Sequence, residues 1–204
     1  MERGYIIVGL GNPGEEYAST PHNAGRMVIE RFAETCGCGA FRKERVYRAL
    51  VADGTLRKGG DADGIHVTLV MPETYMNESG KSVAPFFSLP EDVGRLIVVQ
   101  DDIDLPLGTV RVSQDRGTGG HKGVASIVAE TGTNKFIRVR VGIAPTNLFG
   151  QMYKPTKNGG VPAYVVAPLS SQKKKRLDEG VARAVLALTA ILTEGVVPTM
   201  NTFN

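Results

Sequence analysis

Apolar and polar residues at the start of the chain follow first a strand pattern and then a helix pattern. Residues 5–8 form a β-branched and apolar run, which predicts a buried strand that stops at Gly9. Thr20 and Pro21 are typical of a helix N-cap and first turn. The apolar residues that follow recur at helical spacing, and they predict a helix over residues 22–36.

The middle of the chain predicts a hairpin, a helix and a further strand. Residues 45–52 and 65–71 are expected to form two strands on either side of a turn-rich segment at 53–64. A helix is expected over residues 77–86. Residues 96–100 form a short apolar run, which predicts a strand in the centre of the sheet.

The C-terminal half continues this alternation of strands and helices. It predicts strands at 110–113 and 136–143, a glycine-rich loop at 117–123 followed by a helix, a long loop at 144–160, and a last helix capped by Ser170. The expected fold class is therefore α/β: a three-layer sandwich with helices on both faces of a twisted, mostly parallel or mixed sheet. No repeat or linker divides the sequence, so we expect a single domain over residues 1–204, with 144–160 as a mobile lid loop.

The composition is that of a globular protein. Of 204 residues, 42% are hydrophobic and 22% are charged, which disfavours disordered and fibrous classes. No apolar run approaches the roughly 20 residues that a membrane helix needs, and we expect neither a membrane association nor a secretory leader. Cys36 and Cys38 are too close for an ordinary disulfide and too few for a zinc site, which favours the reducing cytoplasm. The net charge of +3 permits a polyanionic partner without requiring one.

Several polar residues are expected to meet at the carboxyl ends of the predicted strands, where α/β sheets bind ligands. Asn12 follows the first strand, Met76 and Asn77 follow the hairpin, and Asp101 follows the next buried strand. His22 lies in the first turn of the first helix. Asn and Asp are also common turn residues, but their joint placement with a histidine favours a site.

His22 is the strongest candidate for a general base. The start of a helix disfavours a protonated imidazole, whereas a nearby carboxylate favours it. If Asp101 reaches the ring, the two influences balance and leave a neutral, oriented base. His66 and His121 are weaker candidates, since one lies in a predicted strand and the other in the glycine loop. Such a base, with an acid and neutral amides, suits attack of water on an activated carbonyl, and an ester is easier to cleave in this way than an amide.

Other chemistries fit the sequence less well. Residues 9–14 match the dinucleotide-binding pattern G-x-G-x-x-G, but Pro13 removes one amide from the motif and the helix starts only at Pro21. No nucleophile elbow is present, and neither cysteine lies near an activating partner. The acidic run at 101–104 is a weak pattern for magnesium, so we expect no metal and no cofactor.

Short motifs occur along nearly the whole chain in an order that is far more specific than any one of them. They are Ile-Val-Gly-Leu-Gly-Asn-Pro-Gly at 7–14, Tyr17, His-Asn-Ala-Gly at 22–25, Thr-Tyr-Met-Asn at 74–77, Asp-Asp-Ile-Asp-Leu-Pro at 101–106, Gly-Gly-His at 119–121 and Phe-Ile-Arg-Val-Arg-Val-Gly-Ile at 136–143. In these motifs the sequence resembles the bacterial-type peptidyl-tRNA hydrolase family. The resemblance implies hydrolysis of the ester between a peptide and the 3′ end of tRNA, without a metal or cofactor.

The resemblance also implies roles for individual residues. His22 is implied as the general base and Asp101 as the residue that orients it. The implied substrate-binding residues are Asn12, Tyr17, Met76 and Asn77. Neutral amides can pair with a peptide bond but not favourably with a free ammonium group, which favours peptidyl over aminoacyl esters.

Lys122 departs from the family pattern, which usually carries Asn after the glycine-loop histidine. We expect Lys122 to bind substrate through a phosphate near the tRNA 3′ end, assisted by the amides of residues 117–123. Pro21 and Thr118 also depart from the pattern, which usually has Arg and His there, and neither is expected to be essential for the chemistry.

Basic residues near the glycine loop are expected to form a tRNA-binding surface. The predicted residues are Arg111, Arg116, Arg138 and Arg140. Contacts of this kind are not sequence-specific and weaken steeply with salt. We therefore expect a monomeric, cytoplasmic enzyme whose partner is tRNA and which needs no protein partner. The alternative is a non-catalytic RNA-binding protein of the splicing type on the same fold.

Overall fold

A computed structural model describes residues 4–57, 64–87, 90–147 and 149–204 of the chain. Its strands form one seven-stranded sheet in the order β2-β3-β4-β1-β5-β7-β6. The strands are β1 (Tyr5–Gly9), β2 (Arg42–Glu44), β3 (Ala49–Leu56), β4 (Ile65–Pro72), β5 (Leu96–Pro106), β6 (Val110–Gln114) and β7 (Ile137–Ala144). Strands β4, β1, β5 and β7 run parallel, while β2, β3 and β6 add antiparallel pairings toward the edges. The expected mixed sheet is confirmed.

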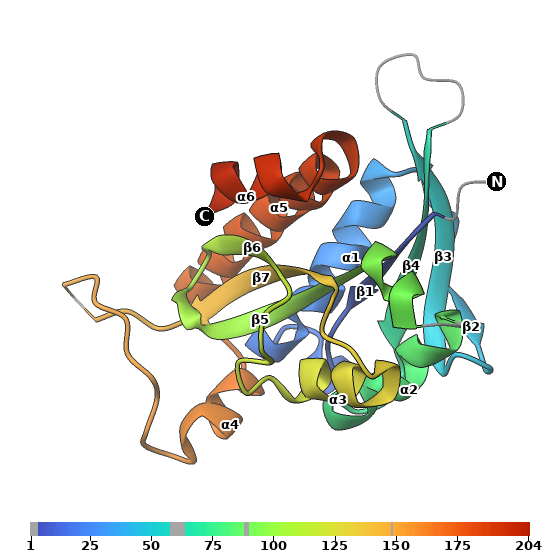
Figure 1. The fold of residues 1–204 in the computed structure, drawn as a ribbon. Helices are drawn as coiled ribbons and strands as arrows, with labels where there is room; N and C mark the ends of the chain where they lie inside the picture. The colour runs from blue at the N-terminus through green and yellow to red at the C-terminus, as the bar shows by residue number, and fades with distance from the viewer. Residues whose placement is uncertain (1–3, 58–63, 88–89, 148) are drawn as a thin grey trace.

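Helices cover both faces of this sheet (Figure 1). The helices are α1 (Ala24–Thr35), α2 (Ser79–Val83), α3 (Lys122–Thr131), α4 (Gly160–Val165), α5 (Ser171–Glu194) and α6 (Val196–Phe203). Helices α1 and α5 pack on one face, where residues such as Phe32, Val99 and Leu188 form one buried cluster. Helices α2 and α3 lie on the other face, over a second cluster that includes Val98 and Ile127. This three-layer α/β sandwich is the expected fold class.

The order of the strands fixes where a ligand can enter. Strand β1 lies between β4 and β5. After β1, the chain first adds β2, β3 and β4 on one side of it and then β5, β6 and β7 on the other side. In an open α/β sheet, a crevice forms at such a reversal, outside the carboxyl ends of the strands. The loops after β1 and β4, the C-terminal part of β5 and the start of α3 therefore meet at one place.

The predicted strand at 45–52 was wrong in its position. Residues 45–48 form a turn in which the Arg48 amide donates to the Arg45 carbonyl, with Arg48 at a φ of 47°. Strand β3 instead continues through the polar stretch around Asp53, because that side chain is paired with Arg42 and accepts a hydrogen bond from Thr68. The hairpin with β4 is confirmed, while its centre at 58–63 lies outside the described residues.

Other boundaries also differ from the expectations. The first helix begins as a 3₁₀ turn at Pro21–Asn23, before α1. The helix expected at 77–86 is divided between α2 and two flanking 3₁₀ turns. The run at Asp101–Asp104, expected after the strand, lies within β5. The helix expected after Ser170 is α5, which ends at Glu194; Gly195, with a φ of 92°, separates it from α6.

The expected lid loop at 144–160 is described except for residue 148. It leaves the body of the molecule and returns to α4, a helix that the sequence pattern did not predict (Figure 1). Within the described part of the chain, no helix combines the length and apolar character needed to span a membrane.

Candidate active site

A cavity of about 390 Å³ lies at the carboxyl ends of β1, β4 and β5. It is lined by residues from the loops after β1 and β4, from β5, from the glycine loop and from α4. Predicted site residues in its lining are Asn12, His22, Met76, Asn77, Asp101 and Lys122. The structure thus brings together residues from five separate motifs of the sequence, at 7–14, 22–25, 74–77, 101–106 and 119–121.

Two histidines share one oxygen of Asp101. The Nδ1 atom of His22 lies 2.8 Å from Asp101 Oδ1, and the Nε2 atom of His121 lies 2.9 Å from the same oxygen. His121 Nδ1 accepts hydrogen bonds from the amides of Gly123 (3.2 Å) and Val124 (3.3 Å) at the start of α3. Because Nδ1 accepts, the proton of a neutral His121 is on Nε2, which donates it to Asp101.

The carboxylate of Asp101 is ionised at neutral pH. Burial alone would raise the pKa of Asp101, but attraction to the His121 and His22 rings holds this pKa well below its ordinary value. The ionised oxygen accepts from His22 Nδ1, so the neutral His22 ring carries its proton on Nδ1. Its Nε2 lone pair is then free to take a proton from another molecule.

A close contact between α1 and the sheet positions His22. A Cβ atom on Gly25 would lie 2.6 Å from backbone atoms of Leu10 and closer still to the carbonyl of Val99. Only glycine therefore lets the start of α1 lie directly on β1 and β5. Since His22 is in the turn that precedes α1, this contact brings its ring within hydrogen-bond distance of Asp101.

Asn12 is held by two neighbours so that one part of its amide remains available. The Asn12 backbone exchanges two hydrogen bonds of 2.9 Å with the Asn23 side chain, and Asn12 Oδ1 accepts from the Met76 amide at 2.9 Å. The Nδ2 group is the part of the Asn12 side chain left to donate to a molecule in the cavity. Asn23 was not singled out by the sequence, although it lies in the matching motif at 22–25.

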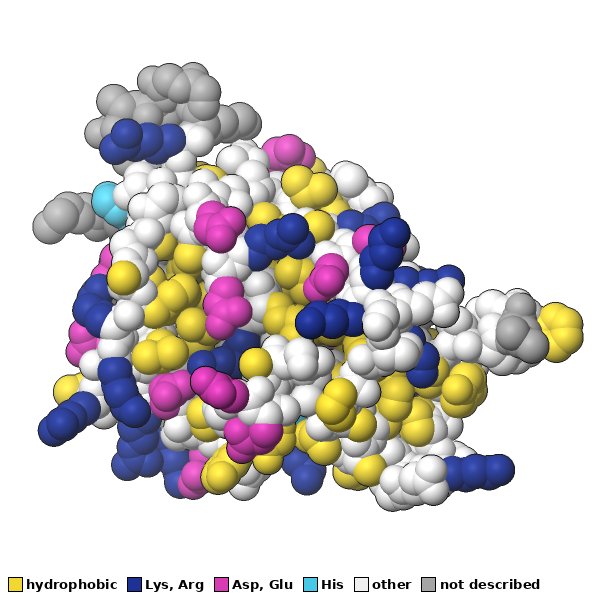
Figure 2. Space-filling view, turned by 180° about the vertical axis from the view of Figure 1, so that it is seen from behind, with side chains coloured by type: hydrophobic (Ala, Val, Ile, Leu, Met, Phe, Trp, Pro, Cys, Tyr) yellow, Lys and Arg dark blue, Asp and Glu magenta, His cyan; other side chains and the backbone are white. Residues whose placement is uncertain are grey.

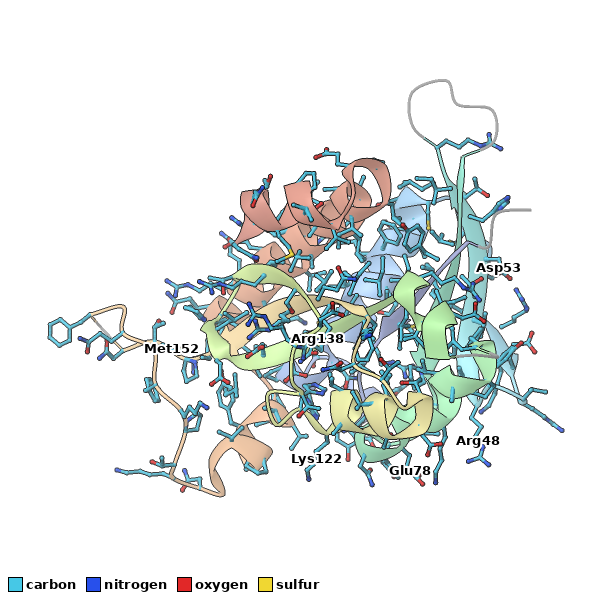
Figure 3. All side chains as sticks on the ribbon, in the orientation of Figure 1. Arg48, Asp53, Glu78, Lys122, Arg138 and Met152 are labelled. Atoms are coloured by element: carbon cyan, nitrogen blue, oxygen red, sulfur yellow. The ribbon has the colours of Figure 1, made fainter. Side chains whose placement is uncertain are left out.

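The other predicted substrate-binding residues occupy different positions around the cavity. Met76 is buried, whereas Asn77 and Lys122 are exposed residues of the lining. Lys122 is the first residue of α3 (Figure 3). Tyr17 lies in the 3₁₀ turn Glu15–Tyr17 and does not belong to the described lining, so its role stays a prediction.

The donor set His22, Asp101 and His121 has the chemistry of a metal site, since one ligand atom of each lies within 4.8 Å of the others. The hydrogen bonds around His121 oppose such a site. A metal on Nε2 would leave the proton of the ring on Nδ1, where two backbone N–H groups already point. Asp102 and Asp104 are engaged by Arg140 and Lys154, which disfavours the magnesium alternative as well.

The four arginines predicted to bind tRNA line a second cavity of about 500 Å³. Arg138 is only 4% exposed, and none of the described carboxylates forms an ion pair with it (Figure 3). Burial and the neighbouring Arg140 lower the pKa of Arg138, which still leaves a guanidinium that is protonated at neutral pH. Asp102 and Gly119 line both this arginine cavity and the catalytic cavity, so the two adjoin.

The surface seen from behind has a different charge pattern from that of the arginine cavity. Viewed from behind, basic side chains lie interspersed with acidic ones (Figure 2). The arginine cavity instead gathers four cations around one acidic side chain, Asp102, among its described lining.

Comparison with known proteins identifies the family. The family model for peptidyl-tRNA hydrolase matches residues 6–204. The chain belongs to the peptidyl-tRNA hydrolase family. The peptidyl-tRNA hydrolases of Solibacter usitatus and Koribacter versatilis are 36% and 39% identical over 201 residues, covering 98% of this chain and 94% and 92% of theirs. The solved structure of the peptidyl-tRNA hydrolase from Acinetobacter baumannii is 31% identical with a TM-score of 0.79, covering 98% of this chain and 94% of that one.

Within this peptidyl-tRNA hydrolase fold, sequence reasoning undervalued His121. It was placed in the glycine loop and ranked below His22, but it is the second partner of Asp101. The signal that could have identified it is its position directly before a helix, where a side-chain acceptor caps the first amides. His66, the other weak candidate, is exposed on β4, and among the described residues its ring has a hydrogen bond only with the Thr55 hydroxyl.

Proposed function

We propose that this protein hydrolyses the ester bond between a peptide and the 3′ end of tRNA, with His22 as the general base. The observation that carries the proposal is the bond from His22 Nδ1 to the buried Asp101 carboxylate. It orients the ring and leaves Nε2 free in a cavity where Asn12 offers a donor group. The family membership supports the substrate, since the named relatives are peptidyl-tRNA hydrolases.

The proposed reaction proceeds through a tetrahedral intermediate. His22 Nε2 removes a proton from water while the water oxygen bonds to the ester carbonyl carbon. Asn12 Nδ2 donates to the oxyanion, and Asp101 stabilises the imidazolium that has formed. The bond from carbon to the tRNA 3′ oxygen then breaks, and that oxygen takes the proton back from His22. The products are a free carboxylic acid and tRNA with a free 3′-hydroxyl.

The arginine cavity supports the binding of tRNA phosphates. Arg111, Arg116 and Arg138 form no ion pair with a described carboxylate, so their charges are available to an anion. We propose that these residues, with Arg140, bind the tRNA backbone and that Lys122 contacts a phosphate near its 3′ end. In Lys122→Ala, the salt dependence of KM is expected to weaken, and an unchanged dependence would exclude the phosphate role. Lys122→Asn tests whether the residue usual in the family can substitute for the lysine.

The loop at 144–160 is proposed to act as a lid over the peptide. Its C-terminal end leads into α4, whose residues Val161, Pro162 and Val165 line the catalytic cavity. Lys154 in the loop pairs with Asp104 on β5, which connects the proposed lid to the strand that carries Asp101. We also propose that the protein acts as a monomeric single domain in the cytoplasm.

The deciding experiment incubates the protein with N-acetyl-aminoacyl-tRNA and, separately, with aminoacyl-tRNA. We expect release of the acetylated amino acid and much slower release of the free one. His22→Ala should lower kcat by ~10²–10⁴ with little change in tRNA affinity, while the matched control His66→Ala should leave both unchanged. Binding of tRNA without hydrolysis would instead support the non-catalytic RNA-binding alternative.

A further inference from the structure

Gln100 is a buried side chain of the catalytic cavity that the proposed mechanism does not use. It is only 2% exposed, lies directly before Asp101 in β5 and lines the cavity. Its Nε2 donates to the Asp101 carbonyl at 3.3 Å. Because only the amide nitrogen can face a carbonyl oxygen, the orientation of the Gln100 amide is set and Oε1 lies on its other side.

The Oε1 atom of Gln100 has no hydrogen-bond partner among the described residues. Buried polar atoms are nearly always paired, and an unpaired one destabilises the folded state. An apolar side chain of the same length would avoid this cost at a position within a hydrophobic strand. Gln100 lines a ligand cavity, so a buried acceptor on this side chain without a described protein donor points to a donor on the ligand.

The position of Gln100 indicates which part of the substrate supplies that donor. Asp101, next in the strand, belongs to the ester chemistry, whereas Arg140 is the direct neighbour of Gln100 in the β5–β7 ladder. Arg140 lines the arginine cavity, which adjoins the catalytic one at Asp102. Gln100 therefore lies between the group that orients the base and the cations proposed to bind phosphate.

In a peptidyl-tRNA, the terminal ribose lies between the ester and the nearest phosphate. Its 3′ oxygen carries the acyl group, so the 2′-hydroxyl is the hydrogen-bond donor of that sugar next to the ester. We infer that Gln100 Oε1 accepts a hydrogen bond from this 2′-hydroxyl, which makes Gln100 a specificity residue for ribose over deoxyribose ends. The inference rests on the proposed function. A neutral acceptor suits this place because a carboxylate would repel the adjacent phosphate.

The test crosses an enzyme variant with a substrate variant. Wild type and Gln100→Met are assayed on N-acetyl-aminoacyl-tRNA that ends in adenosine, 2′-deoxyadenosine or 2′-O-methyladenosine. We expect both modified ends to lower kcat/KM of the wild type about tenfold more than that of Gln100→Met. Comparing the two enzymes removes the intrinsic difference in ester reactivity. Gln114→Met, an exposed glutamine of β6 outside both cavities, should behave like the wild type.

Several results would overturn the inference. One is an equal effect of Gln100→Met on all three substrates, and another is a wild type that discriminates no better than Gln100→Met. If the wild type hydrolyses no ester, the proposed function fails. The affinity for deacylated tRNA ending in ribose or 2′-deoxyribose then decides the inference separately, and equal affinities would refute it.

Discussion

Substitution of Asp101 by Asn tests how the two histidines depend on one carboxylate. The amide oxygen of Asn can still accept from both His22 Nδ1 and His121 Nε2, but without a negative charge. If the amide turned its nitrogen toward the rings, two N–H donors would face each other at His121. That ring cannot adapt, because the amides of Gly123 and Val124 fix its tautomer. His121 therefore selects the oxygen-inward orientation and keeps His22 in the productive tautomer.

The expected loss of kcat in Asp101→Asn follows from the missing negative charge alone. Hydrogen bonds to a charged partner contribute about 1.5–3 kcal/mol, against about 0.5–1.5 kcal/mol for neutral pairs. The difference is felt mainly in the transition state, when His22 becomes an imidazolium, and it amounts to about 1–1.5 kcal/mol. At about 1.4 kcal/mol for each factor of ten, kcat should fall about 5- to 10-fold. An amide that forced the wrong tautomer would cost about 10⁴-fold instead.

The assay is kcat/KM for N-acetyl-aminoacyl-tRNA as a function of pH. In Asp101→Asn the acidic limb of the profile should move to lower pH, because an amide favours the protonated imidazole less than a carboxylate does. His121→Phe added to Asp101→Asn removes the fixed donor and lets the amide turn, so kcat should fall about 10²-fold further. A loss of 10⁴ or more in the single variant, or no further loss in the double variant, would refute the role given to His121.

Three further outcomes are expected from the structure. Arg138→Met should raise the free energy of unfolding by about 1 kcal/mol, because it removes a buried cation that forms no ion pair with a described carboxylate. In tRNA binding assays the same variant should lower affinity and reduce the salt slope by about 1, and a less stable variant with an unchanged salt slope would contradict this. Gly25→Ala should lower the free energy of unfolding by about 3 kcal/mol and also lower kcat, because the added methyl meets the backbone of Leu10, directly after β1, and of Val99 on β5. Normal stability of this variant in denaturant unfolding would contradict the expectation. Because the pKa of Asp101 is lowered in the folded state, this carboxylate stabilises the fold above its ordinary pKa of 3.8, and the stabilisation is lost as the pH falls below that value. The free energy of unfolding of Asp101→Asn should therefore change less between about pH 5 and pH 2 than that of the wild type, as measured by acid denaturation.

Local patterns in the sequence predicted the parts of the fold that depend on burial. The apolar run of β1 and the helical spacing in α5 gave the right elements, since each reflects one buried surface. The shift of β3 could not be predicted in this way. Its polar residues remain in a strand because Arg42 and Thr68 on neighbouring strands pair with Asp53, and such partners are set by the tertiary structure.

The residues that meet in the catalytic cavity were predicted where residue type points to them and missed where only a spatial partner does. His22 and Asp101 were singled out because an imidazole and a carboxylate at strand ends are rarely needed for packing. The sequence did not indicate a role in the site for Gln100, because this residue ends an apolar run and a polar residue there indicates only that the run stops. Its significance depends on an unpaired oxygen, which becomes visible only when all its neighbours are in place.

The hydrogen bonds of the site connect the start of α3 to the proposed base on the other face of the sheet. The amides of Gly123 and Val124 fix His121, His121 fixes the Asp101 oxygen, and that oxygen orients His22. Each group in this series has its donors and acceptors assigned, so no rotation of a single ring or carboxylate can occur without breaking a hydrogen bond. Preorganisation of this kind supports the proposed role of His22 as the base for ester hydrolysis, because the cost of orienting the proton acceptor is met during folding rather than in the transition state.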